Sequence, residues 1–153
     1  MLRRATAKYQ EESQGAVMKR AEALFSKLTR GRYERLRVEF EGEGATIRCV
    51  RGGEAVQVKE RVMSDGTLDQ LYLALRLASI EQYLTDQEPM PLVLDDIFIN
   101  FDDGRAQAGI EVLAEFAQKT QVLLFTHHGR NLELARQVLA PGTWSEVQLN
   151  LPG

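Results

Sequence analysis

Two short apolar runs, each followed at once by polar and reactive side chains, place the strongest constraint on how this chain folds. Residues 92–94 (Leu-Val-Leu) lead into Asp95 and Asp96. Residues 122–125 (Val-Leu-Leu-Phe) lead into residues 126–128 (Thr-His-His). Uninterrupted apolar runs that alternate with helices are typical of parallel strands buried between layers, so the sequence predicts an α/β fold.

Helical periodicity fills the segments around these two strands. We expect helices over 67–84, 104–119 and 131–139, and a closing strand over 144–149. Thr67 and Gln70 have the spacing of a capping box at the start of the first of these helices. Residues 89–91 (Pro-Met-Pro) should interrupt regular structure before the first apolar strand.

The first sixty residues follow a different pattern. Residues 2–28 lack proline and carry a thin apolar stripe, which indicates a helix at the end of a coiled coil. Alternating apolar residues then predict strands over 35–40, 45–50 and 55–58. The glycine turns between these strands are short, so the three strands should be antiparallel.

The expected organisation has two parts. Residues 1–30 form the coiled-coil end helix, and residues 31–153 form a C-terminal lobe. Within the lobe, residues 31–60 are the antiparallel meander and residues 61–153 are the α/β part that carries the reactive side chains.

Composition excludes several classes of protein. The chain has 153 residues, of which 44% are hydrophobic and 27% charged, as in an ordinary globular domain. Its longest uncharged run, 120–129, is shorter than the roughly 18 residues that a membrane span needs. No apolar stretch near the start predicts a secretory signal, and the single cysteine, Cys49, fits a reducing compartment. We therefore expect a soluble cytoplasmic protein without a membrane partner.

Charge is distributed unevenly along the chain. Residues 1–37 hold ten Lys and Arg against four Asp and Glu, although the whole chain has a formal net charge of −3. A basic segment of this kind fits nucleic acid, because neutralising phosphates drives non-specific binding. A solvated helix with its charges in water is the simpler interpretation, and charge alone does not decide between the two.

The strand ends predict a ligand site. In open α/β sheets ligands bind at the carboxyl ends of the strands, where Asp95-Asp96 and His127 are expected. Paired carboxylates after an apolar strand hold Mg²⁺ and orient water beside a nucleotide phosphate. Residues 63–67 (Met-Ser-Asp-Gly-Thr) add a helix start whose amides form an anion site. A solvated acidic loop, a structural histidine and simple helix capping are the alternatives for these three features.

Four segments in this order resemble the signature motif, Walker B motif, D-loop and H-loop of an ABC-type ATPase head: residues 64–67 (Ser-Asp-Gly-Thr), 92–96 (Leu-Val-Leu-Asp-Asp), 100–102 (Asn-Phe-Asp) and 125–127 (Phe-Thr-His). With the coiled-coil end and the meander, the chain is similar to the C-terminal lobe of SMC and SbcC-like ATPases. The run 64–78 most resembles the YhaN-like branch. The resemblance implies the C-terminal half of a P-loop NTPase, acting in DNA repair or chromosome maintenance.

The resemblance also implies which residues bind nucleotide. Ser64 and Gly66 would contact the γ-phosphate of an ATP held by a second head, so a homodimer of heads is expected. Asp102 would lie at the seam between the heads. Arg76 matches an arginine that couples ATP binding to head movement. DNA is the implied macromolecular partner.

Three further residues would carry the hydrolysis of ATP. Asp95 would hold Mg²⁺ through water, Asp96 stands in the position of the general base, and His127 would sense the γ-phosphate. Asp96 departs from the glutamate usual in the family and is one methylene shorter. Asp65 departs from the usual glycine and brings a carboxylate towards a phosphate site.

A P-loop is missing from the sequence. Gly-x-x-x-x-Gly-Lys-Ser/Thr, which cradles phosphates with backbone amides and a lysine, occurs nowhere in these 153 residues. In the family this motif lies in an N-terminal Walker A lobe of the same protein, so that lobe is an expected partner. The isolated chain should neither bind nor hydrolyse ATP.

Two other classes of function remain open from the residues alone. One is a non-catalytic module that binds DNA or protein through its basic helix. The other is a metal-dependent phosphoesterase that would use a cluster of acidic and histidine side chains: Asp95, Asp96, Asp102, Asp103, His127 and His128. The sequence offers no complete nucleophile or pocket for the phosphoesterase.

Overall fold

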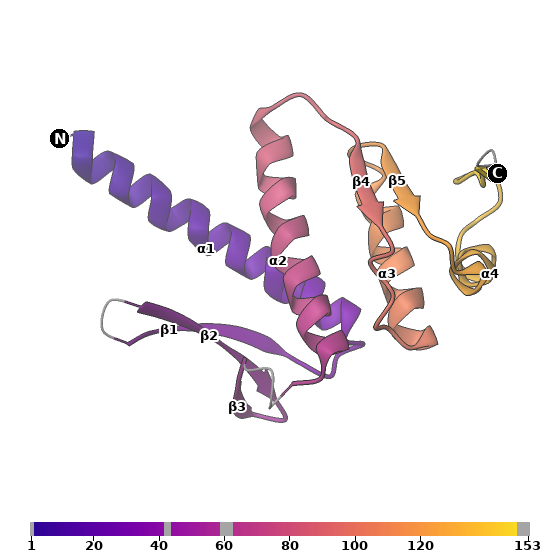
Figure 1. Ribbon diagram of the computed structural model, residues 1–153. Coiled ribbons are helices and arrows are strands. Elements are labelled where there is room, and N and C mark those ends of the chain that lie inside the picture. The colour runs from indigo at the N-terminus through magenta and orange to yellow at the C-terminus, as the bar shows by residue number, and fades with distance from the viewer. Residues whose placement is uncertain (1, 42–43, 59–62, 150–153) are drawn as a thin grey trace. The chain divides into compact units, whose positions relative to one another are not determined.

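The computed structural model describes residues 2–41, 44–58 and 63–149 (Figure 1). The chain divides into two compact units, residues 1–89 and residues 90–153. The boundary falls inside the Pro89-Met90-Pro91 segment, which has no helix or strand, as its prolines predict. Among the described residues no helix is both long enough and apolar enough to cross a bilayer.

The first unit combines two helices with an antiparallel sheet. Its elements are α1 (Leu2–Leu28), β1 (Arg35–Glu41), β2 (Gly44–Arg51), β3 (Glu54–Gln57) and α2 (Asp65–Asp86). The strands pair in the order β1-β2-β3, and both pairs are antiparallel. The predicted first helix and the predicted meander are therefore confirmed.

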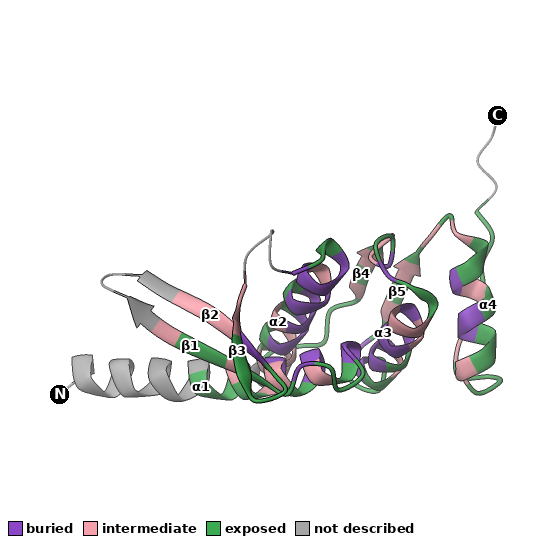
Figure 2. Cartoon of the chain, turned by 90° about the horizontal axis from the view of Figure 1, so that it is seen from below, coloured by how far each residue is buried: buried purple, intermediate pink, exposed green. Residues whose placement is uncertain are grey.

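Packing between α1 and α2 forms the core of this unit. The C-terminal turns of α1 bury Leu24, Phe25 and Leu28, and α2 buries a row of apolar side chains along one side (Figure 2). Fully burying one such side chain stabilises the fold by about 1.5–3 kcal/mol relative to leaving it exposed. The apolar stripe seen in the sequence of α1 is therefore the face that packs against α2.

The predicted capping box at Thr67 and Gln70 is wrong. Helix α2 begins earlier, with Ser64 as its N-cap residue. Gln70 is fully buried, and its side-chain amide donates a hydrogen bond to the carbonyl of Leu28. The last carbonyls of a helix lack partners within the helix, so Gln70 satisfies an acceptor at the end of α1. A tertiary hydrogen bond thus replaces the local one that the spacing predicted.

The second unit contains the two parallel strands of the predicted α/β part, residues 61–153, whereas α2, which the prediction included in that part, belongs to the first unit. Its elements are β4 (Leu92–Asp95), α3 (Asp103–Phe116), β5 (Val122–Phe125) and α4 (Gly129–Val138). Strands β4 and β5 are parallel, and α3, which contacts β5 and α4, makes the crossover between them (Figure 1). The α/β fold class is therefore confirmed.

Two expectations about this unit are wrong. Residues 144–149 form neither a helix nor a strand, and Val147 there is 77% exposed. A strand needs a neighbour to pair with, and the described part of the sheet contains only β4 and β5. The two strands were also expected to be buried on both faces. Instead, more and less exposed residues alternate along each strand, and Val93 is 59% exposed.

Close packing around Phe98 joins the loop after β4 to α3. Phe98 is 1% exposed, and its ring lies 5.4 Å from that of Phe101, centroid to centroid. A Cβ atom added at Gly109 of α3 would lie 2.3 Å from Cε1 of Phe98. Glycine is therefore required at this position because the ring approaches the helix backbone.

We predict that Gly109→Ala destabilises the chain. Overpacking a core costs about 1–3 kcal/mol, and the gain in helix propensity of about 1 kcal/mol offsets only part of it. Chemical denaturation of Gly109→Ala should show a lower free energy of unfolding. Gly129→Ala is the matched control in the same unit, because no atom lies within 4 Å of the added Cβ. Equal stability of the two variants would contradict the account of Phe98 packing.

Candidate functional site

The ends of β4 and β5 bring the predicted site residues of the second unit together. Asp95 is paired with Phe125 in the parallel register, so the residues that follow each strand lie side by side. The backbone N–H of Asp96 donates to the carbonyl of Phe125 over 3.0 Å. The two strands therefore deliver Asp96 and Thr126-His127 to one edge of the sheet, as the sequence predicted.

The backbone turns sharply at Asp96. Its φ of 44° lies in the left-handed region, which few residues other than glycine adopt and which aspartate and asparagine tolerate best. The carbonyl of Asp96 accepts a hydrogen bond from the N–H of Ile99 at 3.2 Å, which closes a turn after the strand. Backbone in such a region is found most often where the surrounding structure holds it for a function.

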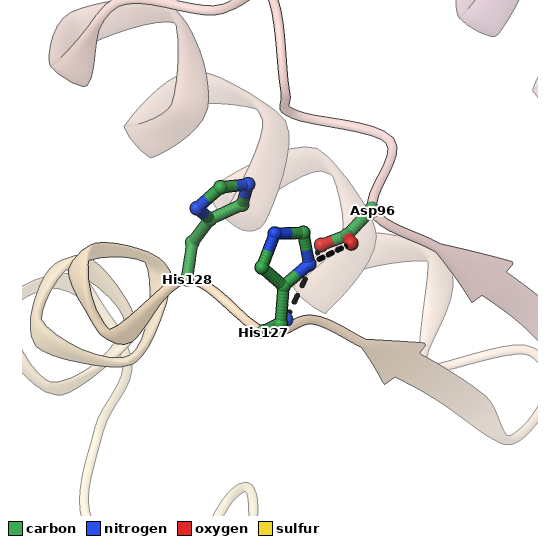
Figure 3. A group of neighbouring side chains, drawn as sticks. All are labelled: Asp96, His127 and His128. Carbon is green, nitrogen blue, oxygen red and sulfur yellow. Dashed lines mark hydrogen bonds and ion pairs between the residues drawn. The ribbon is translucent and has the colours of Figure 1, made fainter.

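The carboxylate of Asp96 is held on both of its oxygens (Figure 3). Its Oδ1 accepts a hydrogen bond from the hydroxyl of Thr126 at 2.9 Å, and its Oδ2 contacts Nδ1 of His127. The His127 side chain is 70% exposed and that of Asp96 is 25% exposed. The second ring nitrogen of His127 has no hydrogen bond to any described residue, so it remains available to a ligand.

Thr126 connects this pair to α4. Its hydroxyl oxygen accepts hydrogen bonds from the side-chain amide of Asn131, at 3.0 Å, and from the backbone N–H of His128, at 3.2 Å. Asn131 is 4% exposed. The threonine hydroxyl therefore uses both its donor and its acceptor capacity. No role was predicted for Thr126, because its hydrogen bonds join the loop after β4 to α4, and sequence spacing does not reveal such contacts.

These contacts lower the pKa of Asp96 below its ordinary value. Partial desolvation is the largest single influence and acts in the opposite direction. The hydrogen bonds from the Thr126 hydroxyl and from the ring and backbone N–H of His127, together with the charge of His127, outweigh it. Asp96 is therefore an ionised acceptor at neutral pH.

The other predicted residues of this unit lie nearby in the chain. Asp95 is the last residue of β4 and is exposed, and its carboxylate has no partner among the described residues. Asp102 is the N-cap of α3, where its side chain accepts from the backbone N–H of Arg105 at 2.9 Å and pairs with the Arg105 guanidinium at 3.3 Å. Asp102 therefore has a structural role in starting α3.

Ser64 and Gly66 lie at the start of α2 in the first unit, with Ser64 exposed and Gly66 buried. The Ser64 hydroxyl bonds the hydroxyl of Thr67 at 2.9 Å and does not cap the helix backbone. The helix dipole favours a negative group here, which also explains the exposed Asp65 in the first turn. Ser64 and Asp65 are therefore the exposed residues at the described N-terminus of α2.

Comparison with known proteins gives a limited match in sequence. No family model matches the chain. The uncharacterized protein YhaN of Bacillus subtilis (strain 168) is 30% identical over 113 residues, which are 73% of this chain. The match spans 11% of the length of YhaN.

Solved structures give a clearer match in fold. One solved chain comes from work on ATP-driven dimerization and DNA stimulated activation of SMC ATPases. The match covers 84% of the present chain and 77% of the solved one, with a TM-score of 0.68 and 17% identity. The Smc head domain from Pyrococcus furiosus, bound to the C-terminal domain of ScpA, matches with a TM-score of 0.58 and 19% identity. That match covers 78% of this chain and 30% of the solved one.

The SMC head domain from Thermotoga maritima matches with a TM-score of 0.55 and 24% identity, over 78% of this chain and 40% of the solved one. The chain therefore has the fold of one lobe of an SMC-like ATPase head, a P-loop NTPase fold, as the sequence resemblance predicted.

We predict that Thr126→Val raises the pKa of Asp96 towards the ordinary aspartate value of about 3.9. The pKa of Asp96 is lowered in the folded chain. Asp96 therefore stabilises the fold at pH values above its ordinary pKa, and this stabilisation is lost as the pH falls through the folded-state pKa. Carbon-13 NMR of the Asp96 carboxyl measures the shift. Thr143→Val is the control, since that hydroxyl bonds only the carbonyl of Ala140. An unchanged Asp96 titration in Thr126→Val would contradict the assigned hydrogen bond.

Proposed function

We propose that this chain is the C-terminal lobe of an SMC-like ATPase, which takes part in binding and hydrolysing ATP between two dimerised heads. The observation that carries the proposal is the Asp96 and His127 pair, which lies at the ends of two parallel strands in an ATPase-head fold. An ionised carboxylate held against an exposed imidazole suits both orientation of water and contact with phosphate.

Mg²⁺ and ATP fit the residues at this edge of the sheet. Asp95 offers an exposed carboxylate with no partner among the described residues, and Mg²⁺ prefers oxygen ligands. When bound, the ion would neutralise charge that develops on the phosphates. Asp96 would then orient the attacking water as general base. His127, whose Nδ1 contacts Asp96, would donate from its other nitrogen to the γ-phosphate when the ring carries both protons.

A second head completes the proposed site. The open N-terminus of α2, with Ser64 exposed, supports contact between Ser64-Asp65-Gly66 and the γ-phosphate of an ATP held by the opposite head. Asp102, exposed at the start of α3, would lie at the seam. Dimerization driven by ATP is stated for the SMC ATPases of the first structural match, and we extend it to this chain.

An N-terminal lobe with a P-loop is the other proposed partner. The β4-β5 sheet leaves Val93, Leu123 and Phe125 exposed on one face, at 59%, 38% and 42%. Parallel sheets are normally covered on both faces, so a further layer is expected over these side chains. The small share of YhaN that the chain spans supports a longer parent protein that would supply that layer.

The proposal also includes DNA as a partner and the cytoplasm as the location. Four arginines near the α1-β1 connection are exposed and could meet phosphates: Arg30, Arg32, Arg35 and Arg37. DNA stimulated activation is described for the SMC ATPases of the first structural match, and on this basis we propose a role in DNA repair or chromosome maintenance. The single cysteine, Cys49, is free and buried, which supports a reducing compartment.

We predict that Asp96→Asn in the heads reassembled with the parental N-terminal lobe lowers ATP turnover by at least about 10²-fold, the usual cost of losing a general base. Asparagine tolerates the left-handed backbone at this position, so the change removes charge without disturbing the turn. ATP-dependent dimers should still form. Steady-state phosphate release and gel filtration with ATP measure the two properties.

Two further variants sharpen this test. Asp96→Glu keeps the carboxylate and restores the family's usual reach, so it should retain turnover even though glutamate tolerates the left-handed backbone less well than aspartate. Glu111→Gln on α3 is the control, because it neutralises an exposed carboxylate outside the pair. Near-normal turnover in Asp96→Asn would remove Asp96 from the mechanism.

A further inference from the structure

The two histidines of the chain are consecutive, and both lie beside Asp96. One ligand atom each of Asp96, His127 and His128 lies within 4.8 Å of the others. Figure 3 shows the His127 ring between the Asp96 carboxylate and the His128 ring. The chain thus gathers all of its imidazoles and one carboxylate at a single point.

The two rings come together because β5 ends before them. Successive side chains of a strand point to opposite faces, yet the rings of His127 and His128 lie 3.9 Å apart, centroid to centroid. Strand β5 ends at Phe125, and His128 is already the N-cap residue of α4. The change from strand to helix therefore places both imidazoles on the same side.

His128 has an unused group that the proposed ATP chemistry does not explain. Its Nε2 atom is buried and has no hydrogen-bond partner among the described residues. Burying a polar atom without a partner costs free energy, which a ligand at that atom would recover. The ring that carries this nitrogen belongs to the same cluster as the exposed imidazole of His127.

We propose that Asp96, His127 and His128 bind one divalent transition-metal ion of the zinc type. Two imidazoles and one carboxylate are ligands typical of zinc, whereas Mg²⁺ prefers oxygen ligands alone. Metal bonds of about 2.0–2.2 Å place tetrahedral ligand atoms roughly 3.3–3.6 Å apart. The three ligand atoms lie within 4.8 Å of one another, so binding the ion would require them to move closer together.

The surroundings of the cluster support this coordination. Oδ2 of Asp96 would leave Nδ1 of His127 and bind the ion. Oδ1 would keep the hydrogen bond from Thr126. Hydrogen bonds of this kind orient metal ligands from the outer shell. Three protein ligands leave the fourth position of the ion to water. The ion would use the same Asp96 and His127 side chains as the ATP chemistry proposed above, so the two cannot occupy the site together. The test below therefore measures binding of the metal alone.

Titration of the untagged chain with Zn²⁺ by calorimetry, and with Co²⁺ by visible spectroscopy, tests the proposal. We expect one ion per chain, ligand-field bands from Co²⁺, and no competition from millimolar Mg²⁺. His128→Asn should weaken Zn²⁺ binding at least about tenfold, since even outer-shell partners contribute about 10–100-fold. Asparagine is a favoured N-cap residue, so this variant should preserve the start of α4.

The control variant is Cys49→Ala, which removes the only thiol and should leave Zn²⁺ affinity unchanged. Circular dichroism checks that each variant is folded. Failure of the wild-type chain to bind Zn²⁺ saturably would overturn the proposal. Wild-type affinity in a folded His127→Ala/His128→Ala double variant would overturn it as well.

Discussion

The parallel pairing of β4 with β5 is the interaction on which the site depends. The two strands end level with each other, with Asp95 paired to Phe125, so that Asp96 meets Thr126 and His127 directly after the sheet. A shift of the register by one residue would turn these side chains to the opposite face. Packing of α3 beneath the strands, with Gly109 against Phe98, holds the crossover that makes this pairing possible.

The sequence predicts those parts of this arrangement that follow from hydrophobic periodicity and from the direction of the strands. Apolar runs revealed both strands, and the rule that ligands bind at their carboxyl ends placed Asp96 near His127. Local patterns could not reveal the left-handed backbone of Asp96 or the hydrogen bonds of Thr126, because both depend on contacts between segments. Gln70 illustrates the same limit: its spacing predicted a cap, but burial against α1 gave it a tertiary partner.

Two features support the proposal that the chain supplies one part of a composite site: the uncovered face of its sheet and the missing P-loop. One face of β4 and β5 leaves large apolar side chains exposed, and the residues that cradle phosphates in a P-loop are missing from the sequence. Under the proposed function, the chain supplies the part of such a site that would act at the far end of the phosphates. The ends of the two strands hold the Asp96 carboxylate against the ring of His127, and Thr126 donates to the same carboxylate.

Calorimetric titration of Mg-ATP tests the central claim, that this chain supplies one part of a composite site. The titration is run on the chain alone and on the chain mixed with the P-loop lobe of its parent protein. The account predicts no measurable heat of binding for the chain alone and saturable binding for the mixture, because the chain lacks the phosphate cradle. A micromolar one-to-one isotherm from the chain alone would contradict it.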